Sequence, residues 1–188
     1  MMMQILEAAG LELYVDGSRL ADSDNPKGYF EIEATKRLPE DASFLTEAIG
    51  KVVKVVAPLL HFIPEEFGGR VIFIERNMQE ILASQDVMMS RTKSVEISAM
   101  ESRALGRAFQ KRVDDAKAWL EDSGRFQILT VAHSFVVDSP DEASAKVFDF
   151  LEETGALAAV SSPEDERRAR LSRMADVVDA SLYRQRSR

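Results

Sequence analysis

The chain has 188 residues, a formal net charge of −8 and no cysteine. This charge argues against general binding to nucleic acid or to anionic membranes, and the lack of thiols excludes disulfides, thiol catalysis and thiolate-bound metals. Two histidines, His61 and His133, lie far apart in the sequence and do not indicate a metal site. No apolar run approaches the roughly 18 residues of a membrane span, and no secretory signal is visible. We therefore expect a single cytoplasmic domain over residues 1–188, without a metal ion.

The first part of the chain combines short helices with turns. Met1 to Gly10 has a helical pattern that ends at a glycine, and no capping residue precedes it. Leu11 to Val15 follows as a short extended segment, and Asp22 to Gly28 is rich in turn-forming residues. A short helix that ends near Leu38 and a second helix over residues 41–49 are predicted next.

Three segments have the pattern of buried strands. Lys51 to Ala57 is rich in valine but is interrupted by Lys54, a residue type that is rarely buried without a partner. Val71 to Ile74 and Phe126 to Ala132 are apolar runs of the kind found in parallel sheets. Strands that alternate with helices predict an α/β fold, with a parallel sheet flanked by helices. Three strands are few for such a sheet, and a missing first strand would explain both this number and the uncapped first helix.

Helices are predicted between and after the strands. One covers residues 77–90, and a long amphipathic helix covers residues 95–122. The apolar stripe of the long helix, expected to face the core, consists of Leu105, Phe109, Val113, Ala116 and Leu120. Ser139 and Ser162 each precede a proline and have an acidic residue three positions later, which predicts capped N-termini for two further helices.

The carboxyl end of the strand over residues 71–74 is a candidate anion site. Arg76 lies at this end, where open α/β sheets bind ligands. Ser84 lies eight residues later, within the helix that follows. A guanidinium and a hydroxyl that converge there would suit phosphate. A solvated arginine and an ordinary helix serine account for the same spacing equally well.

Four segments together resemble the bacterial sulfotransferase family, whose members have a P-loop NTPase-like fold and use 3′-phosphoadenosine 5′-phosphosulfate (PAPS). They are residues 1–10, 24–31, 76–85 and 174–184, and the resemblance extends over most of the chain. Its most specific element is an arginine followed, after seven residues, by a serine directly after a strand. The resemblance therefore implies that Arg76 and Ser84 bind the 3′-phosphate of PAPS.

The chain departs from this family in two places. Family members have a strand and a glycine-rich loop, which binds the 5′-phosphosulfate, immediately before the helix that starts here at Met1, and the chain contains no substitute. They also have a strand that ends in Lys-Thr-His, with the histidine as general base, whereas the equivalent segment here is Lys54-Val-Val56. Lys54 and His61 are left as the weaker catalytic candidates.

These departures predict a poor catalyst, because the loss of a single transition-state donor typically costs about 10²–10³-fold in rate. Either the chain start is set inside the first helix or the loop has been lost, and the uncapped helix favours the first explanation, a truncated N-terminus. An unpaired sheet edge would in addition favour self-association, and hence a homo-oligomer.

The resemblance thus implies transfer of a sulfuryl group from PAPS to a hydroxyl or amine of an unknown small-molecule or peptide acceptor, by a chain that is inactive in this form. The alternative is a non-catalytic, degenerate P-loop-fold module that binds a protein partner through its long charged helix or its basic tail. A kinase is disfavoured, because no lysine-bearing phosphate loop and no Mg²⁺-binding carboxylate motif is visible.

Overall fold

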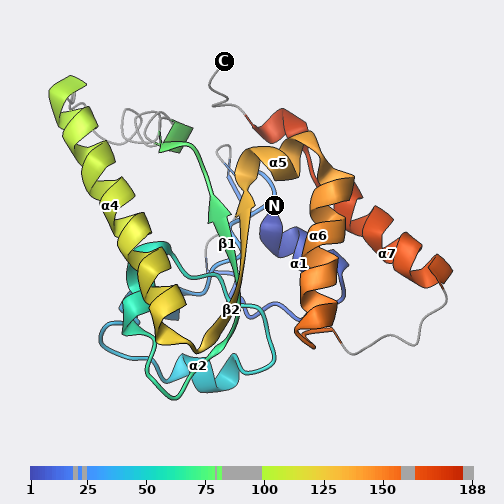
Figure 1. Ribbon diagram of the computed structural model, residues 1–188, viewed down its shortest axis with the longest axis horizontal. Coiled ribbons are helices and arrows are strands. Elements are labelled where there is room, and N and C mark those ends of the chain that lie inside the picture. The colour runs from blue at the N-terminus through green and yellow to red at the C-terminus, as the bar shows by residue number, and fades with distance from the viewer. Residues whose placement is uncertain (19–20, 23–24, 79, 82–98, 158–163, 184–188) are drawn as a thin grey trace.

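The computed structural model describes residues 1–18, 21–22, 25–78, 80–81, 99–157 and 164–183. In this part of the chain, a two-stranded parallel sheet lies between helices (Figure 1). Strand β1 (Gly69–Glu75) pairs with β2 (Phe126–Ala132) in a register that runs from Gly69 opposite Phe126 to Glu75 opposite Ala132. The predicted α/β class with a parallel sheet flanked by helices is confirmed. The more specific expectation of a P-loop NTPase-like fold stays a prediction.

Alternate side chains of the two strands pack into two separate cores, one on each face of the sheet. Ile72 and Ile74 of β1 lie in the core that contains Val131 of β2. Phe73 lies in the other core, together with Leu120. Because both faces are covered, Val71–Ile74 is a continuous apolar run and β2 is apolar except at Gln127 and Thr130, and for this reason the sequence pattern located both strands correctly.

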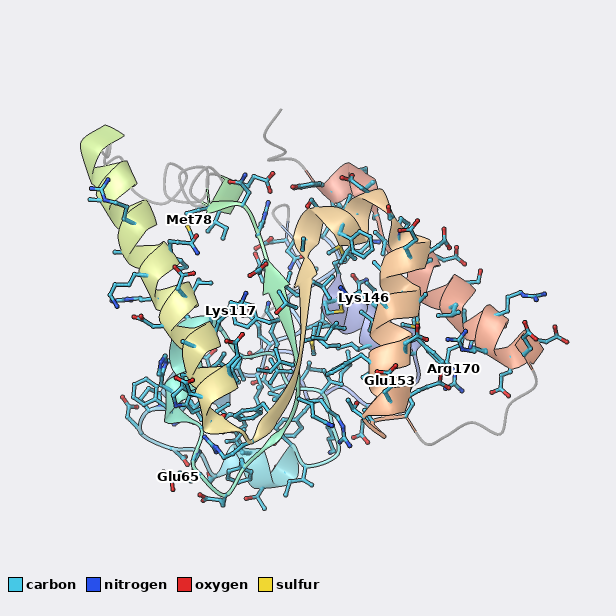
Figure 2. The ribbon with its side chains drawn as sticks, viewed as in Figure 1. Glu65, Met78, Lys117, Lys146, Glu153 and Arg170 are labelled. Carbon is cyan, nitrogen blue, oxygen red and sulfur yellow. The ribbon has the colours of Figure 1, made fainter. Side chains whose placement is uncertain are left out.

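Helix α4 (Ala99–Ser123) and the 3₁₀ helix η2 (Ala57–Phe62) cover one face of the sheet. Ala116 and Leu120 of the predicted stripe are buried there, whereas Leu105 is 41% exposed, so the prediction is wrong at that position. The reason is geometric, since the N-terminal half of α4 extends away from the sheet (Figure 1). Lys117 of α4, labelled in Figure 2, forms an ion pair with Glu75 and thereby ties the helix to the end of β1.

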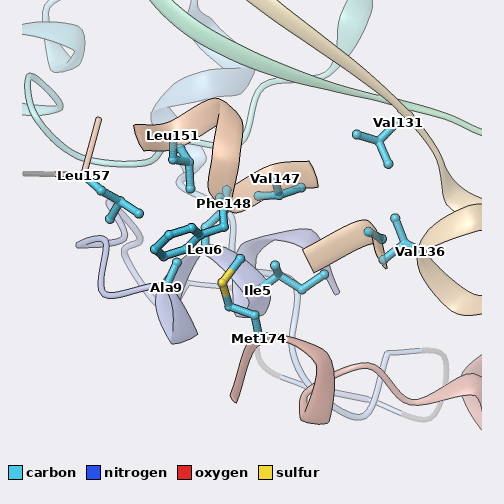
Figure 3. Close-up of a cluster of buried hydrophobic side chains, with 11 residues drawn as sticks. Ile5, Leu6, Ala9, Val131, Val136, Val147, Phe148, Leu151, Leu157 and Met174 are labelled. Carbon is cyan, nitrogen blue, oxygen red and sulfur yellow. The ribbon is translucent and has the colours of Figure 1, made fainter. Parts of the chain in front are cut away.

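In the described part of the chain, four helices cover the other face: α1 (Met2–Ala8), α5 (His133–Asp138), α6 (Pro140–Glu153) and α7 (Glu164–Asp176). Ile5, Phe148 and Met174 are among the fully buried side chains of this core, one from each of α1, α6 and α7 (Figure 3). The helix predicted over residues 1–10 is confirmed as α1. None of the helices in the described ranges combines the length and the apolarity needed to cross a membrane.

The third predicted strand is not part of the sheet. Among the described residues, Val52 is the only one of residues 51–57 that forms a β-bridge, an isolated parallel bridge to Leu13. Val53 and Val55 instead contribute to a small core with Phe44. This core contains or adjoins η1 (Glu33–Arg37) and α2 (Phe44–Glu47), the short helices expected in this part of the chain. The packing of Val53 and Val55, which are partly buried, thus accounts for part of the apolar pattern without a β-ladder.

Two predictions about helix starts differ from the structure or lie outside it. Ser139 precedes α6, but its side chain makes no capping hydrogen bond; instead its backbone N–H donates to the carbonyl of Phe135 at 2.9 Å. In a capping box this N–H would donate to the side chain of Glu142, but α5, which was not predicted, runs directly into α6 and supplies a backbone acceptor instead. Ser162, and most of the helix predicted over residues 77–90, lie outside the described residues. One further 3₁₀ turn, η3 (Ala180–Leu182), follows α7.

Candidate functional site

Arg76 and His133 are brought together by the register of the sheet. Glu75 and Ala132 are the last paired residues of β1 and β2, so Arg76 and His133 each follow a strand at the same edge. Glu80 and Tyr183 contact these two side chains. We call the group of Arg76, Glu80, His133 and Tyr183 the carboxyl-edge site. It is the edge at which parallel sheets of α/β proteins bind ligands.

Within the described part of the chain, the guanidinium of Arg76 is paired through its Nε. Its Nε lies 3.5 Å from Oε2 of Glu80, one helical turn later, and Nε is buried without a hydrogen-bond partner among the described residues. The side chain as a whole is 28% exposed, whereas that of Glu80 is only 4% exposed. Glu75, the other nearby carboxylate in sequence, pairs with Lys117. Among the described residues, Glu80 is therefore the carboxylate that pairs with the positive charge of Arg76, and it does so loosely, at 3.5 Å.

Tyr183 closes the site from the C-terminal end of the described chain. Its hydroxyl lies 2.7 and 2.6 Å from the two carboxylate oxygens of Glu80, to which it donates its proton. Its ring meets the ring of His133 edge-on, with centroids 4.9 Å apart. The same ring lies 5.8 Å from the guanidinium carbon of Arg76. Tyr183 thus contacts all three other members of the site.

The segment that carries Tyr183 is fastened to the loop near residue 27. Lys27 Nζ donates to the carbonyl of Val177 at 3.0 Å and forms an ion pair with Asp179 at 3.6 Å. Asp179 also accepts hydrogen bonds from the backbone N–H and the hydroxyl of Ser181, at 3.1 and 2.6 Å. These contacts fix the chain direction before Tyr183, so the position of its ring is determined by several elements of the fold.

His133 is uncharged at neutral pH. Its pKa is lowered from 6.5 to about 4, mainly by burial and next by the charge of Arg76, while Glu80 acts in the opposite direction. Its Nδ1 is buried and has no hydrogen-bond partner within the described part of the chain. A neutral imidazole can donate or accept a hydrogen bond without adding charge to the site. With a pKa of about 4, however, it is a weak proton acceptor.

Lys54, the first of the two weaker catalytic candidates, is held by other groups. Its Nζ donates to Oε1 of Glu31 at 2.8 Å and to the carbonyl of Tyr29 at 3.1 Å. Between these two partners, Phe30 has a φ of 51°, a left-handed conformation that is rare for a bulky residue. The ammonium of Lys54 is therefore already compensated by Glu31, and any contact with a sulfonate would compete with that ion pair.

His61, the second candidate, lies in η2 and is exposed. Its ring packs 5.4 Å from that of Trp119 in α4, so its contacts are with the helix that covers one face of the sheet. No contact among the described residues joins it to Arg76. Ser84, the expected partner of Arg76, lies outside the described residues, and its role stays a prediction.

Of the four members of the carboxyl-edge site, the sequence predicted only Arg76, and Glu80, His133 and Tyr183 were missed. Glu80 could have been found, since it lies four residues after Arg76 in a predicted helix, the spacing of a helical ion pair. No spacing in the sequence could indicate Tyr183, because its contact with Glu80 joins residues 103 positions apart.

The chemistry that this arrangement offers is recognition of an anion. Arginine binds phosphate-like groups through pairs of N–H donors, and Arg76 is the member of the site able to hold the phosphate of a cofactor. Among the described residues, no group of three or more histidine and carboxylate side chains could hold a metal ion.

Comparison with known proteins identifies no relative of this chain. No family model matches it, and neither a curated protein nor a solved structure is similar enough to match.

Proposed function

We propose that this protein is sulfotransferase-like and binds PAPS, or its product adenosine 3′,5′-bisphosphate, at the carboxyl-edge site. Arg76 would contact the 3′-phosphate, with Ser84 as the second contact. One observation carries the proposal: Arg76 follows β1 at the edge shared with β2, and its guanidinium is anchored through Nε at 3.5 Å from Glu80. No hydrogen bond or ion pair within the described residues occupies its terminal nitrogens, so they can meet an incoming anion.

Electrostatics support a local rather than a general anion site. The chain has a net charge of −8, so its overall field repels a multiply charged nucleotide. The affinity must therefore come from short-range, charge-assisted hydrogen bonds, of which a bidentate arginine contact is a strong form. Such a contact is partly shielded from water at Arg76, because only 28% of its side chain is exposed.

The proposed chemistry is transfer of the sulfuryl group from PAPS to a hydroxyl or amine acceptor. This transfer depends on donors that neutralise charge on the moving group. The described residues of the carboxyl-edge site supply one such cation and one neutral histidine. We therefore expect nucleotide binding to be readily measurable and turnover to be very slow.

The test is calorimetric titration with adenosine 3′,5′-bisphosphate. A charge-assisted contact contributes about 1.5–3 kcal/mol, so Arg76→Ala should weaken binding by roughly 10- to 150-fold. Arg70→Ala is the matched control, because it removes the same charge near the opposite end of β1, where Arg70 Nε donates to the carbonyl of Thr154 at 2.8 Å.

Arg70→Ala should leave the affinity nearly unchanged. Equal affinities for the wild type and Arg76→Ala would remove Arg76 from the site. A wild-type protein that binds no adenosine nucleotide would overturn the proposal and favour the non-catalytic module.

A further inference from the structure

We infer that Tyr183 and Glu80 are positioning residues, which hold Arg76 by its Nε side and present its two terminal nitrogens to a phosphate. This inference rests on the proposed function, since it explains how the arginine stays available to an anion. It concerns residues that neither touch the ligand nor take part in sulfuryl transfer.

The guanidinium of Arg76 has two edges that can bind an anion. Arginine has a side edge that includes Nε and an end edge formed by Nη1 and Nη2, and either edge can bind an oxyanion with two hydrogen bonds. Glu80 Oε2 lies opposite Nε, at 3.5 Å. A carboxylate on the side edge orients the group and leaves the end edge open. The distance is longer than that of a charge-assisted hydrogen bond, so the pair is loose.

The pair of Arg76 and Glu80 is loose because Tyr183 also binds the carboxylate. Glu80 is 4% exposed, and a buried carboxylate is costly unless hydrogen-bond donors compensate its charge. Tyr183 places its hydroxyl 2.7 and 2.6 Å from the two oxygens. The phenol therefore satisfies the carboxylate that would otherwise pair closely with Arg76. Without this competing donor, Glu80 would neutralise more of the arginine's charge.

Contacts that do not involve its hydroxyl keep the ring of Tyr183 in place. Lys27 ties the chain at Val177 and Asp179, and this contact joins residues 150 positions apart. The ring of Tyr183 also rests edge-on against His133. Because these supports do not involve the hydroxyl, Tyr183→Phe should keep the ring in position and remove the hydrogen bond to Glu80.

The test is a double-mutant cycle measured by titration with adenosine 3′,5′-bisphosphate. Tyr183→Phe should weaken binding by about 3- to 10-fold, the effect of one hydrogen bond. In the Arg76→Ala background the same substitution should have no effect, because the residue that it positions is absent. An equal loss in both backgrounds, or no loss in either, would overturn the inference.

Tyr14→Phe is the matched control. Tyr14 also donates its hydroxyl to a carboxylate, Oε2 of Glu47, at 2.8 Å. That pair is exposed and contains no member of the carboxyl-edge site, so its removal should leave nucleotide affinity unchanged.

A second readout needs no nucleotide. In the ligand-free protein, the Nε–H proton of Arg76 can be followed by NMR and assigned by its loss in Arg76→Ala. Tyr183→Phe should shift this signal downfield and slow its exchange with water, as the bond to Glu80 tightens. An unchanged signal would refute the positioning role whether or not the protein binds nucleotide. Absence of nucleotide binding together with a shifted signal would refute the proposed function alone.

Discussion

A fall in pH should destabilise the folded protein, because the fold lowers the pKa of His133. The folded protein holds the pKa of this imidazole at about 4, against 6.5 for a free histidine, mainly because of burial and secondarily because of Arg76. Between these two values the unfolded chain binds a proton that the folded chain does not. The free energy of unfolding must therefore decrease as the pH falls from about 6.5 towards 4. Above this range both states are neutral, and the contribution is constant.

The magnitude follows from the shift. Fully expressed, a change from 6.5 to about 4 would be worth about 3 kcal/mol. The imidazole is only partly buried, and solvent screening reduces its coupling to the surroundings. We therefore expect a loss of about 1–2 kcal/mol between pH 7.5 and pH 4.5 that is specific to His133.

The assay is urea unfolding of the wild type and of His133→Gln at both pH values. All other titrating groups are common to the two proteins, so the difference in their unfolding free energies isolates His133. That difference should move by about 1–2 kcal/mol in favour of the variant at the lower pH. A difference that does not depend on pH would show that His133 titrates normally in the folded protein, and would refute the reasoning.

Three further predictions concern stability. Phe148→Ala should lower the unfolding free energy by about 3–5 kcal/mol, because the ring is fully buried, whereas Phe62→Ala should cost under about 1 kcal/mol; equal losses in denaturant titrations would contradict the assigned core. Gly68→Ala should cost about 1–3 kcal/mol, since a Cβ there would lie 2.6 Å from the carbonyl oxygen of Arg125; an unchanged melting temperature would be inconsistent with this contact. Lys54→Met should cost only about 0.2–1 kcal/mol, as its ion pair is partly exposed; a loss above about 2 kcal/mol, measured by urea unfolding, would show a stronger pair.

The local sequence pattern predicted β1 and β2 correctly. It was not sufficient to show that residues 51–57, which have a similar pattern, lie outside the sheet. Val71–Ile74 and Phe126–Ala132 are apolar because helices cover both faces of the sheet. Residues 51–57 contain four valines, more than either strand, yet among the described residues only Val52 forms a β-bridge to another chain segment. The valine-rich residues 133–138 form a helix, in which Val136 and Val137 are buried. In both segments tertiary packing decides the conformation, and periodicity over six or seven residues cannot reveal it.

For the carboxyl-edge site too, some features could be predicted from the sequence and others could not. Arg76 could be located from the sequence, because a charged residue directly after a buried strand must lie at the carboxyl edge. The uncharged state of His133 could not be predicted, since it depends on burial beneath other elements. The contact between Tyr183 and Glu80 depends on how the C-terminal segment folds back across the sheet edge, which no local pattern specifies.

The most direct test of the central claim compares two ligands on the wild-type protein. Adenosine 3′,5′-bisphosphate and adenosine 5′-monophosphate differ in the 3′-phosphate, the group assigned to Arg76. Calorimetry should show that the bisphosphate binds at least roughly 10-fold more tightly, the effect of one charge-assisted contact. Equal affinity for the two nucleotides, or no binding of either, would contradict the account.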